Sequence, residues 1–114
     1  MITVIVESPY AADTPAGMVR NLDYLRDCAM DCLHRGEAPF ASHALYTQWL
    51  DDSMPGERRL GIEAGLAIGA RLEKTVVYTD LGITPGMRQG IDRAERESRP
   101  IEYRNLPNWK EEIE

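Results

Sequence analysis

The sequence predicts a small α/β domain in which a doubly wound parallel sheet of about four strands, flavodoxin- or Rossmann-like, carries helices on both faces. Two observations predict this class. Short apolar runs typical of buried strands alternate along the chain with longer segments whose apolar residues recur at helical spacing. The chain has 114 residues, of which 43% are hydrophobic, enough to bury one core without a metal or disulfide. We expect right-handed crossovers between the parallel strands and the strand order 2-1-3-4.

The first half of the chain is predicted to hold two strands and a long helix. Residues 3–6 form a β-branched run typical of a buried strand. The helix begins at Thr14, an N-cap residue followed by proline, and ends at Gly36. Residues 38–43 are a weaker strand, because Pro39 is tolerated only at the first position of a strand or on a sheet edge.

The second half is predicted to hold two helices and two strands. One helix opens at Ser53 and runs to about Lys74, and the strand 75–79 follows. The next helix spans 84–98, and residues 100–103 form the last strand. The aromatic and polar residues between the second strand and the first of these helices are expected to cover a pocket.

We expect one domain over residues 1–104 and a polar tail over 105–114, with Trp109 docking on the domain. The net charge of −6 argues against binding a nucleic-acid polymer, and no apolar run is long enough to span a membrane. The chain lacks a secretory signal pattern, so a cytoplasmic location is expected. Cys28 and Cys32 are interpreted as buried thiols, and neither a metal nor a cofactor is expected.

Three glycines recur every four residues in the helix predicted after Ser53. Gly61, Gly65 and Gly69 each cost roughly 1 kcal/mol of helix propensity relative to alanine. Something should therefore approach this helix face closely, either a neighbouring helix or a second subunit. We predict a dimer through this face.

The topology predicts where a ligand binds. Doubly wound sheets bind ligands at the carboxyl ends of their strands, where the strand order reverses. That point lies between the first and third strands, and the helices after both begin with Thr-Pro, at Thr14 and Thr84. Their free N–H groups are expected to point into one crevice, although simple capping explains either Thr-Pro alone. Gly86 allows a phosphate or ribose to approach the backbone.

At residues 84–94, Thr-Pro-Gly-Met-Arg-Gln-Gly-Ile-Asp-Arg-Ala, the chain resembles the nucleoside 2-deoxyribosyltransferase-like superfamily, which includes nucleoside 5′-monophosphate N-glycosidases. That pattern is Ser-x-Gly-x-x-x-Glu-x-x-x-Ala after a strand. The resemblance extends to Ser8-Pro9-Tyr10 and to Ser42-His43. Residues 42–46, 57–58 and 78–83 are similar to an uncharacterised phage and actinobacterial branch.

The resemblance implies a glutamate nucleophile that attacks the anomeric carbon, positioned by a tyrosine after the first strand. Tyr10, Thr84 and Gly86 match the pattern, but Gly90 stands at the nucleophile position.

Asp80 at a strand end, or Glu63 with a pKa raised by burial, are the expected replacements. Capping of a turn is the alternative role for Asp80. Asp92 is expected to face solvent, because two residues along a helix rotate a side chain by about 200°.

The other predicted ligand-binding residues gather around the same sheet edge. His43 is expected to bind a base or phosphate or to make a structural hydrogen bond, and Tyr46 to stack on a base or to roof the core. The full predicted ligand-binding set is Ser8, Ser42, His43, Tyr46, Thr84, Gly86 and Met87.

Two functions follow for a protein whose partner is a small nucleoside or nucleotide. The first is an N-glycosidase or deoxyribosyltransferase in which Asp80 or Glu63 replaces the missing nucleophile. The alternative is a catalytically inactive protein of the same fold that senses or sequesters a nucleotide. An oligomerising scaffold without a small ligand is a third interpretation, supported only by the glycine face.

Overall fold

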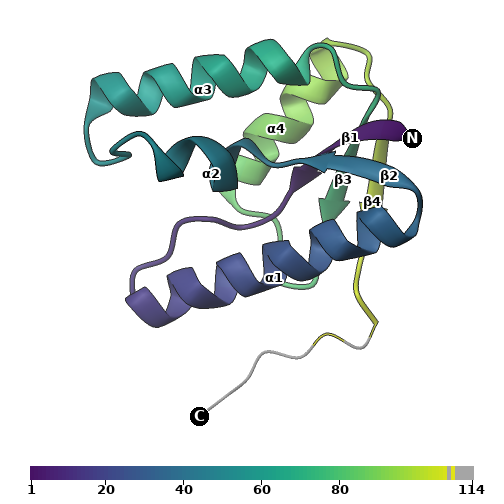
Figure 1. Ribbon diagram of the computed structural model, residues 1–114, viewed down its shortest axis with the longest axis horizontal. Coiled ribbons are helices and arrows are strands. Elements are labelled where there is room, and N and C mark those ends of the chain that lie inside the picture. The colour runs from purple at the N-terminus through teal and green to yellow at the C-terminus, as the bar shows by residue number, and fades with distance from the viewer. Residues whose placement is uncertain (108, 110–114) are drawn as a thin grey trace.

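Four parallel strands form the central sheet of the structure, a computed structural model that describes residues 1–107 and 109 (Figure 1). The strands lie in the order β2-β1-β3-β4, and each neighbouring pair is parallel. Their bounds are β1 (Ile2–Glu7), β2 (Glu37–Phe40), β3 (Lys74–Tyr78) and β4 (Ile101–Arg104). The predicted fold class and strand order are confirmed.

Helices cover both faces of this sheet (Figure 1). The helix α1 (Pro15–His34) lies on one face, and α3 (Pro55–Gly69) and α4 (Pro85–Arg96) lie on the other. A short helix α2 (Ser42–Leu45) and a 3-10 turn η1 (Tyr46–Gln48) connect β2 to α3. Among the described residues, no helix combines the length and the apolar character needed to cross a membrane.

The alternation of side chains along β1 decides which groups face which helices. Val4 and Val6 belong to a buried cluster that includes Tyr24 and Cys28 of α1. Because successive side chains of a strand point to opposite faces, Glu7 points to the face covered by α3 and α4. The free thiols of α1 are buried, as predicted.

The predicted second strand is too long at its carboxyl end. It stops at Phe40, and Ser42 and His43 form the first turn of α2 instead. The carbonyl group of Ala41 accepts the first helical hydrogen bonds of that turn, which ends the strand. Pro39 is accommodated because β2 is an edge strand, as the sequence required.

Helix α3 differs from its prediction at both ends. It ends at Gly69, because Lys74 already belongs to β3 and pairs with β1. Its N-cap is Met54 rather than Ser53, and the cap makes no side-chain hydrogen bond. The Glu57 carboxylate instead accepts a backbone hydrogen bond from the preceding loop.

The glycine face of α3 packs inside the chain. A Cβ atom at Gly65 would lie 2.8 Å from the Cβ of Ser42, and one at Gly69 would lie 3.1 Å from Ile5 Cδ1. Gly61 faces Leu50 in the same way. The expected close neighbour is therefore α2, its following loop and β1. The glycine repeat therefore does not support the predicted dimer, because this face of α3 is already covered by other parts of the same chain.

The segment after β4 contacts α1. The Trp109 indole packs edge-on against Tyr24, with ring centroids 4.8 Å apart, and its N–H donates to Asp27 at 2.9 Å. Residues 108 and 110–114 of the predicted tail lie outside the described residues, and the boundary after residue 104 stays a prediction.

A buried ion pair joins the two edge strands. The guanidinium group of Arg104 donates to both carboxylate oxygens of Glu37, at 2.8 and 2.7 Å. The two side chains are only 3% and 6% exposed. The hydrogen bonds from Arg104 hold the pKa of Glu37 below its usual range. Both charged groups are therefore buried away from water, and each is hydrogen-bonded to the opposite charge of the other.

Replacing Arg104 with leucine leaves the Glu37 carboxylate buried without its main partner. Removing one member of a buried ion pair costs about 3–5 kcal/mol, so we expect the free energy of unfolding to fall by about this amount. Urea denaturation measures the loss. Arg71→Leu, at an exposed position, is the matched control and should change the free energy by less than about 0.5 kcal/mol. Equal losses in the two variants would contradict a special contribution of Arg104.

Candidate functional site

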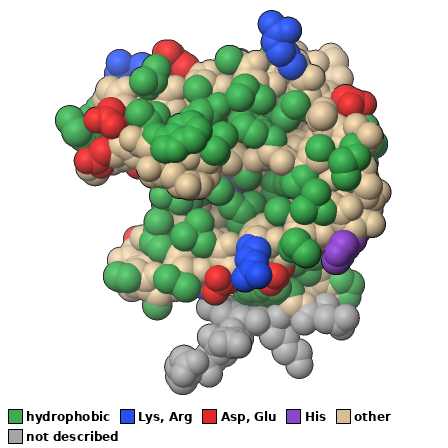
Figure 2. Space-filling model, in the orientation of Figure 1, with side chains coloured by type: hydrophobic (Ala, Val, Ile, Leu, Met, Phe, Trp, Pro, Cys, Tyr) green, Lys and Arg blue, Asp and Glu red, His purple; other side chains and the backbone are tan. Residues whose placement is uncertain are grey.

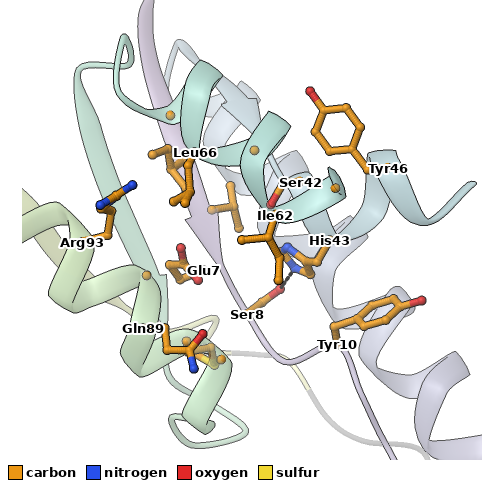
Figure 3. Close-up of a pocket in the computed structure, with 18 of the residues that line it drawn as sticks. Glu7, Ser8, Tyr10, Ser42, His43, Tyr46, Ile62, Leu66, Gln89 and Arg93 are labelled. Atoms are coloured by element: carbon orange, nitrogen blue, oxygen red, sulfur yellow. Dashed lines mark hydrogen bonds between the residues drawn. The ribbon is translucent and has the colours of Figure 1, made fainter. Parts of the chain in front are cut away.

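A groove of about 750 Å³ opens on the face of the sheet covered by α3 and α4, at the carboxyl end of β1. Its floor is the last part of β1, and its walls are α2, α3 and α4 (Figure 3). Thr84 and Gly86 line it, so the groove lies where the sequence places the ligand.

A second hollow of about 710 Å³ lies between α1 and α2, and Figure 2 shows hydrophobic side chains lining the recess between these layers. Among the described residues that line it, none carries a carboxyl or imidazole group. Of these two hollows, the groove between α3 and α4 is therefore the one lined by carboxyl and imidazole groups.

The central feature of the groove is the carboxyl group of Glu7, the last residue of β1. It lies against the backbone of α4 at Gly90, where a Cβ atom would overlap the carboxyl group and lie 2.7 Å from Oε1. Figure 3 shows the Glu7 side chain directed into the space between β1 and the two helices. Only glycine at position 90 lets the carboxyl group take this place.

Glu7 is not among the site residues predicted from the sequence, which place the replacement carboxylate after β3 or on α3. The available signal was a glutamate at the carboxyl end of the central strand together with a glycine at the helix position that the family resemblance gives to a glutamate.

The surroundings of Glu7 favour its neutral form. Burial raises the pKa of Glu7 from its ordinary value of 4.5 to about 8, and the positive charge of Arg99 opposes this shift only in part. Arg99 is itself buried and donates to the Thr75 hydroxyl at 2.9 Å and to the Gly69 carbonyl at 3.0 Å. At neutral pH, Glu7 therefore holds a proton.

Ser8 and His43 form a hydrogen-bonded pair in the same groove. Ser8 Oγ and His43 Nε2 lie 3.0 Å apart, and Ser8 is buried (Figure 3). Burial lowers the pKa of His43 to about 4, so its imidazole is neutral at physiological pH. The Tyr10 ring meets the imidazole edge-on, with centroids 6.2 Å apart.

The predicted ligand-binding residues come together as a group. Those that line the groove, together with Tyr10, are Ser8, Ser42, His43, Tyr46, Thr84, Gly86 and Met87. Thr84 also caps α4, because its hydroxyl accepts the N–H of Met87 at 3.2 Å. The Met87 side chain is mainly a core group, packed with Val77 and Ile91.

The two predicted replacement carboxylates lie outside the groove. Asp80 accepts the Tyr24 hydroxyl at 2.5 Å and the N–H of Leu106, which places it on the α1 face of the sheet. Glu63 is exposed to solvent on α3 and is not buried as expected. Neither carboxylate therefore lines the groove where the sequence predicts a reacting group. Asp92 is exposed, as predicted.

Of the two helix starts expected to share the crevice, only that of α4 lines the groove. The start of α1 belongs to the layer on the opposite face of the sheet, and Thr14 there caps the helix by accepting the Gly17 N–H at 3.1 Å. Within the described part of the chain, no group of three or more His, Cys, Asp or Glu residues is arranged to hold a metal ion.

Comparisons with known proteins support the fold. A family model described as "Domain of unknown function (DUF7768)" matches residues 2–104. The solved structure of the 2-deoxyribosyltransferase from the psychrotolerant bacterium Bacillus psychrosaccharolyticus is similar, with a TM-score of 0.72 and 10% sequence identity over 96% of this chain and 77% of that one. At this identity the likeness shows the fold alone. No curated protein sequence matches the chain.

Replacing Gly90 with alanine should displace the Glu7 carboxyl group toward solvent. We expect its pKa to fall from about 8 toward 4.5, as measured by NMR titration of the carboxyl carbon. In a Glu7→Ala background the same change should stabilise the helix by about 1 kcal/mol, because the overlap is gone. Gly56→Ala is the control, since nothing lies within 4 Å of a Cβ there. An unchanged Glu7 titration would contradict the contact.

The raised pKa of Glu7 makes stability depend on pH. The unfolded chain ionises Glu7 near pH 4.5, whereas the folded chain keeps the proton until about pH 8. The free energy of unfolding should therefore decrease as the pH rises through this window. Glu7→Gln removes this contribution and keeps that of His43. The difference between the pH profiles of the wild-type protein and Glu7→Gln therefore gives the contribution of Glu7 alone. Parallel pH profiles of the two proteins in urea denaturation would rule out the shift.

Proposed function

The chain belongs to the family described as a domain of unknown function, DUF7768, and we propose that it cleaves the N-glycosidic bond of a nucleoside or nucleotide in the groove beside Glu7. The fold supports this proposal, because a 2-deoxyribosyltransferase is built on the same architecture. The groove at the carboxyl end of β1 supports it further, since ligands of doubly wound sheets bind at this edge.

The observation that carries the proposal is the contact between the Glu7 carboxyl group and Gly90. In the superfamily that residues 84–94 resemble, the position of Gly90 belongs to a glutamate that acts on the anomeric carbon. We infer that the reacting carboxyl group has moved from the helix to the strand. Glu7, in place of Asp80 or Glu63, is then the carboxyl group that acts at the glycosidic bond.

The rest of the groove suits a nucleoside or nucleotide. A Cβ atom at Gly86 would meet nothing closer than Thr84 Oγ1 at 3.9 Å, which leaves room for an anion near the Gly86 N–H at the helix start. Tyr10 and Tyr46 offer aromatic rings for a base.

The test is a base-release assay on nucleosides, deoxynucleoside monophosphates and NAD-like dinucleotides, followed by chromatography. We expect the wild-type protein to release free base and Glu7→Gln to be slower by about 10²–10⁴-fold, the usual range for a lost proton-transfer group. Asp80→Asn, whose carboxylate lies outside the groove, is the matched control and should keep its activity.

Two outcomes would count against the proposal. Equal rates for Glu7→Gln and the wild-type protein would exclude Glu7 from the reaction. Binding in calorimetry without base release from any compound would favour the alternative, a nucleotide-binding protein that senses or sequesters its ligand.

A further inference from the structure

The Ser8–His43 pair has no part in the role assigned to Glu7, although it lines the same groove. Ser8 follows β1 directly, and His43 comes from the first turn of α2. Figure 3 shows Glu7 toward α4 and the hydrogen-bonded pair toward α2, so the two sets of groups approach the groove from different sides. A bound sugar between them would have an ionisable group on each side.

Burial gives these groups complementary protonation states. Glu7, with a pKa near 8, holds a proton at neutral pH, whereas His43, with a pKa near 4, does not. Titratable groups whose pKa values are pushed apart in one site are the arrangement of a general acid and a general base. Glu7 is therefore suited to donate a proton, and His43 to accept one.

The following inference rests on the proposed N-glycosidic cleavage. We propose that the second substrate is water and that the Ser8–His43 pair activates it for direct attack on the anomeric carbon. A covalent route requires an ionised carboxylate that projects toward the sugar. The Glu7 carboxyl group instead lies against the backbone of α4 at Gly90. Its position suits protonation of the leaving base, and the attacking oxygen then comes from solvent.

The reaction is a single displacement. A lone pair of the water oxygen forms the bond to the anomeric carbon while the carbon–nitrogen bond breaks. The electron pair of the broken bond leaves with the base. The base nitrogen takes the proton of Glu7. The water proton passes to Ser8 Oγ as the Ser8 proton passes to His43 Nε2. Exchange with solvent then returns a proton from His43 to Glu7.

The stereochemistry of methanolysis tests this mechanism in the wild-type protein. The probes are the common 2′-deoxynucleosides and their 5′-monophosphates, which are β-configured, incubated in buffer containing methanol. Methanol competes with water, and the methyl glycoside keeps its configuration. We expect the α-methyl glycoside in proton NMR spectra, and no new nucleoside when a second base is added.

The outcomes separate the two proposals. The β-methyl glycoside, or transfer to the added base, would overturn direct attack by water and leave N-glycosidic cleavage intact. No base release from any probe would overturn both.

Variants of the pair give a second test. His43→Gln and Ser8→Ala should lower kcat for base release by about 10²–10⁴-fold with little change in KM. Azide needs no general base, so adding it should restore base release in both variants and give the α-azido sugar. Glu7→Gln should not be rescued, and Glu63→Gln, exposed on α3, should behave as wild type. Absence of azide rescue in folded His43→Gln and Ser8→Ala proteins would overturn the role of the pair.

Discussion

The contact between a strand carboxyl group and a helix backbone is the constraint on which the site depends. Glu7 reaches Gly90 only because β1 pairs with β3 in a register that sets Glu7 beside Val77. Val77 is in turn the residue on which Met87 and Ile91 of α4 pack. The apolar packing that fixes α4 on the sheet therefore also fixes the depth at which the carboxyl group is buried. Its raised pKa is a consequence of that packing.

Much of the fold could be predicted because each element carries a local signal. β-Branched runs mark β1 and β3, and Thr-Pro pairs mark the starts of α1 and α4. The strand order β2-β1-β3-β4 is that of a flavodoxin-like doubly wound sheet. Local signals also place the groove, since strand ends and helix starts converge at one edge of a parallel sheet. The turn at Ser42 and His43 escaped prediction because four residues are too few for a helical period to appear.

The chemistry could not be predicted from local signals, as Glu7 and Asp80 illustrate. Both residues end or follow a buried strand, and both are acidic. Tyr78 faces α1, so Asp80, two residues later, points to the same face and binds Tyr24 there. Glu7 follows Val6, which also faces α1, and therefore points to the opposite face. Side chains alternate between the two faces of a sheet, so the two carboxylates lie on opposite faces. Which face each carboxylate takes is known only once the helices that cover the sheet are placed.

The fit of Glu7 against Gly90 also bears on how such a site changes in evolution. A side chain at position 90 and a glutamate at position 7 compete for one volume, so the effect of a mutation at either position depends on the residue at the other. Homologues that keep a glutamate at position 7 should therefore also keep glycine at position 90, and a search pattern that pairs the two positions would recognise the site better than one written on the helix alone.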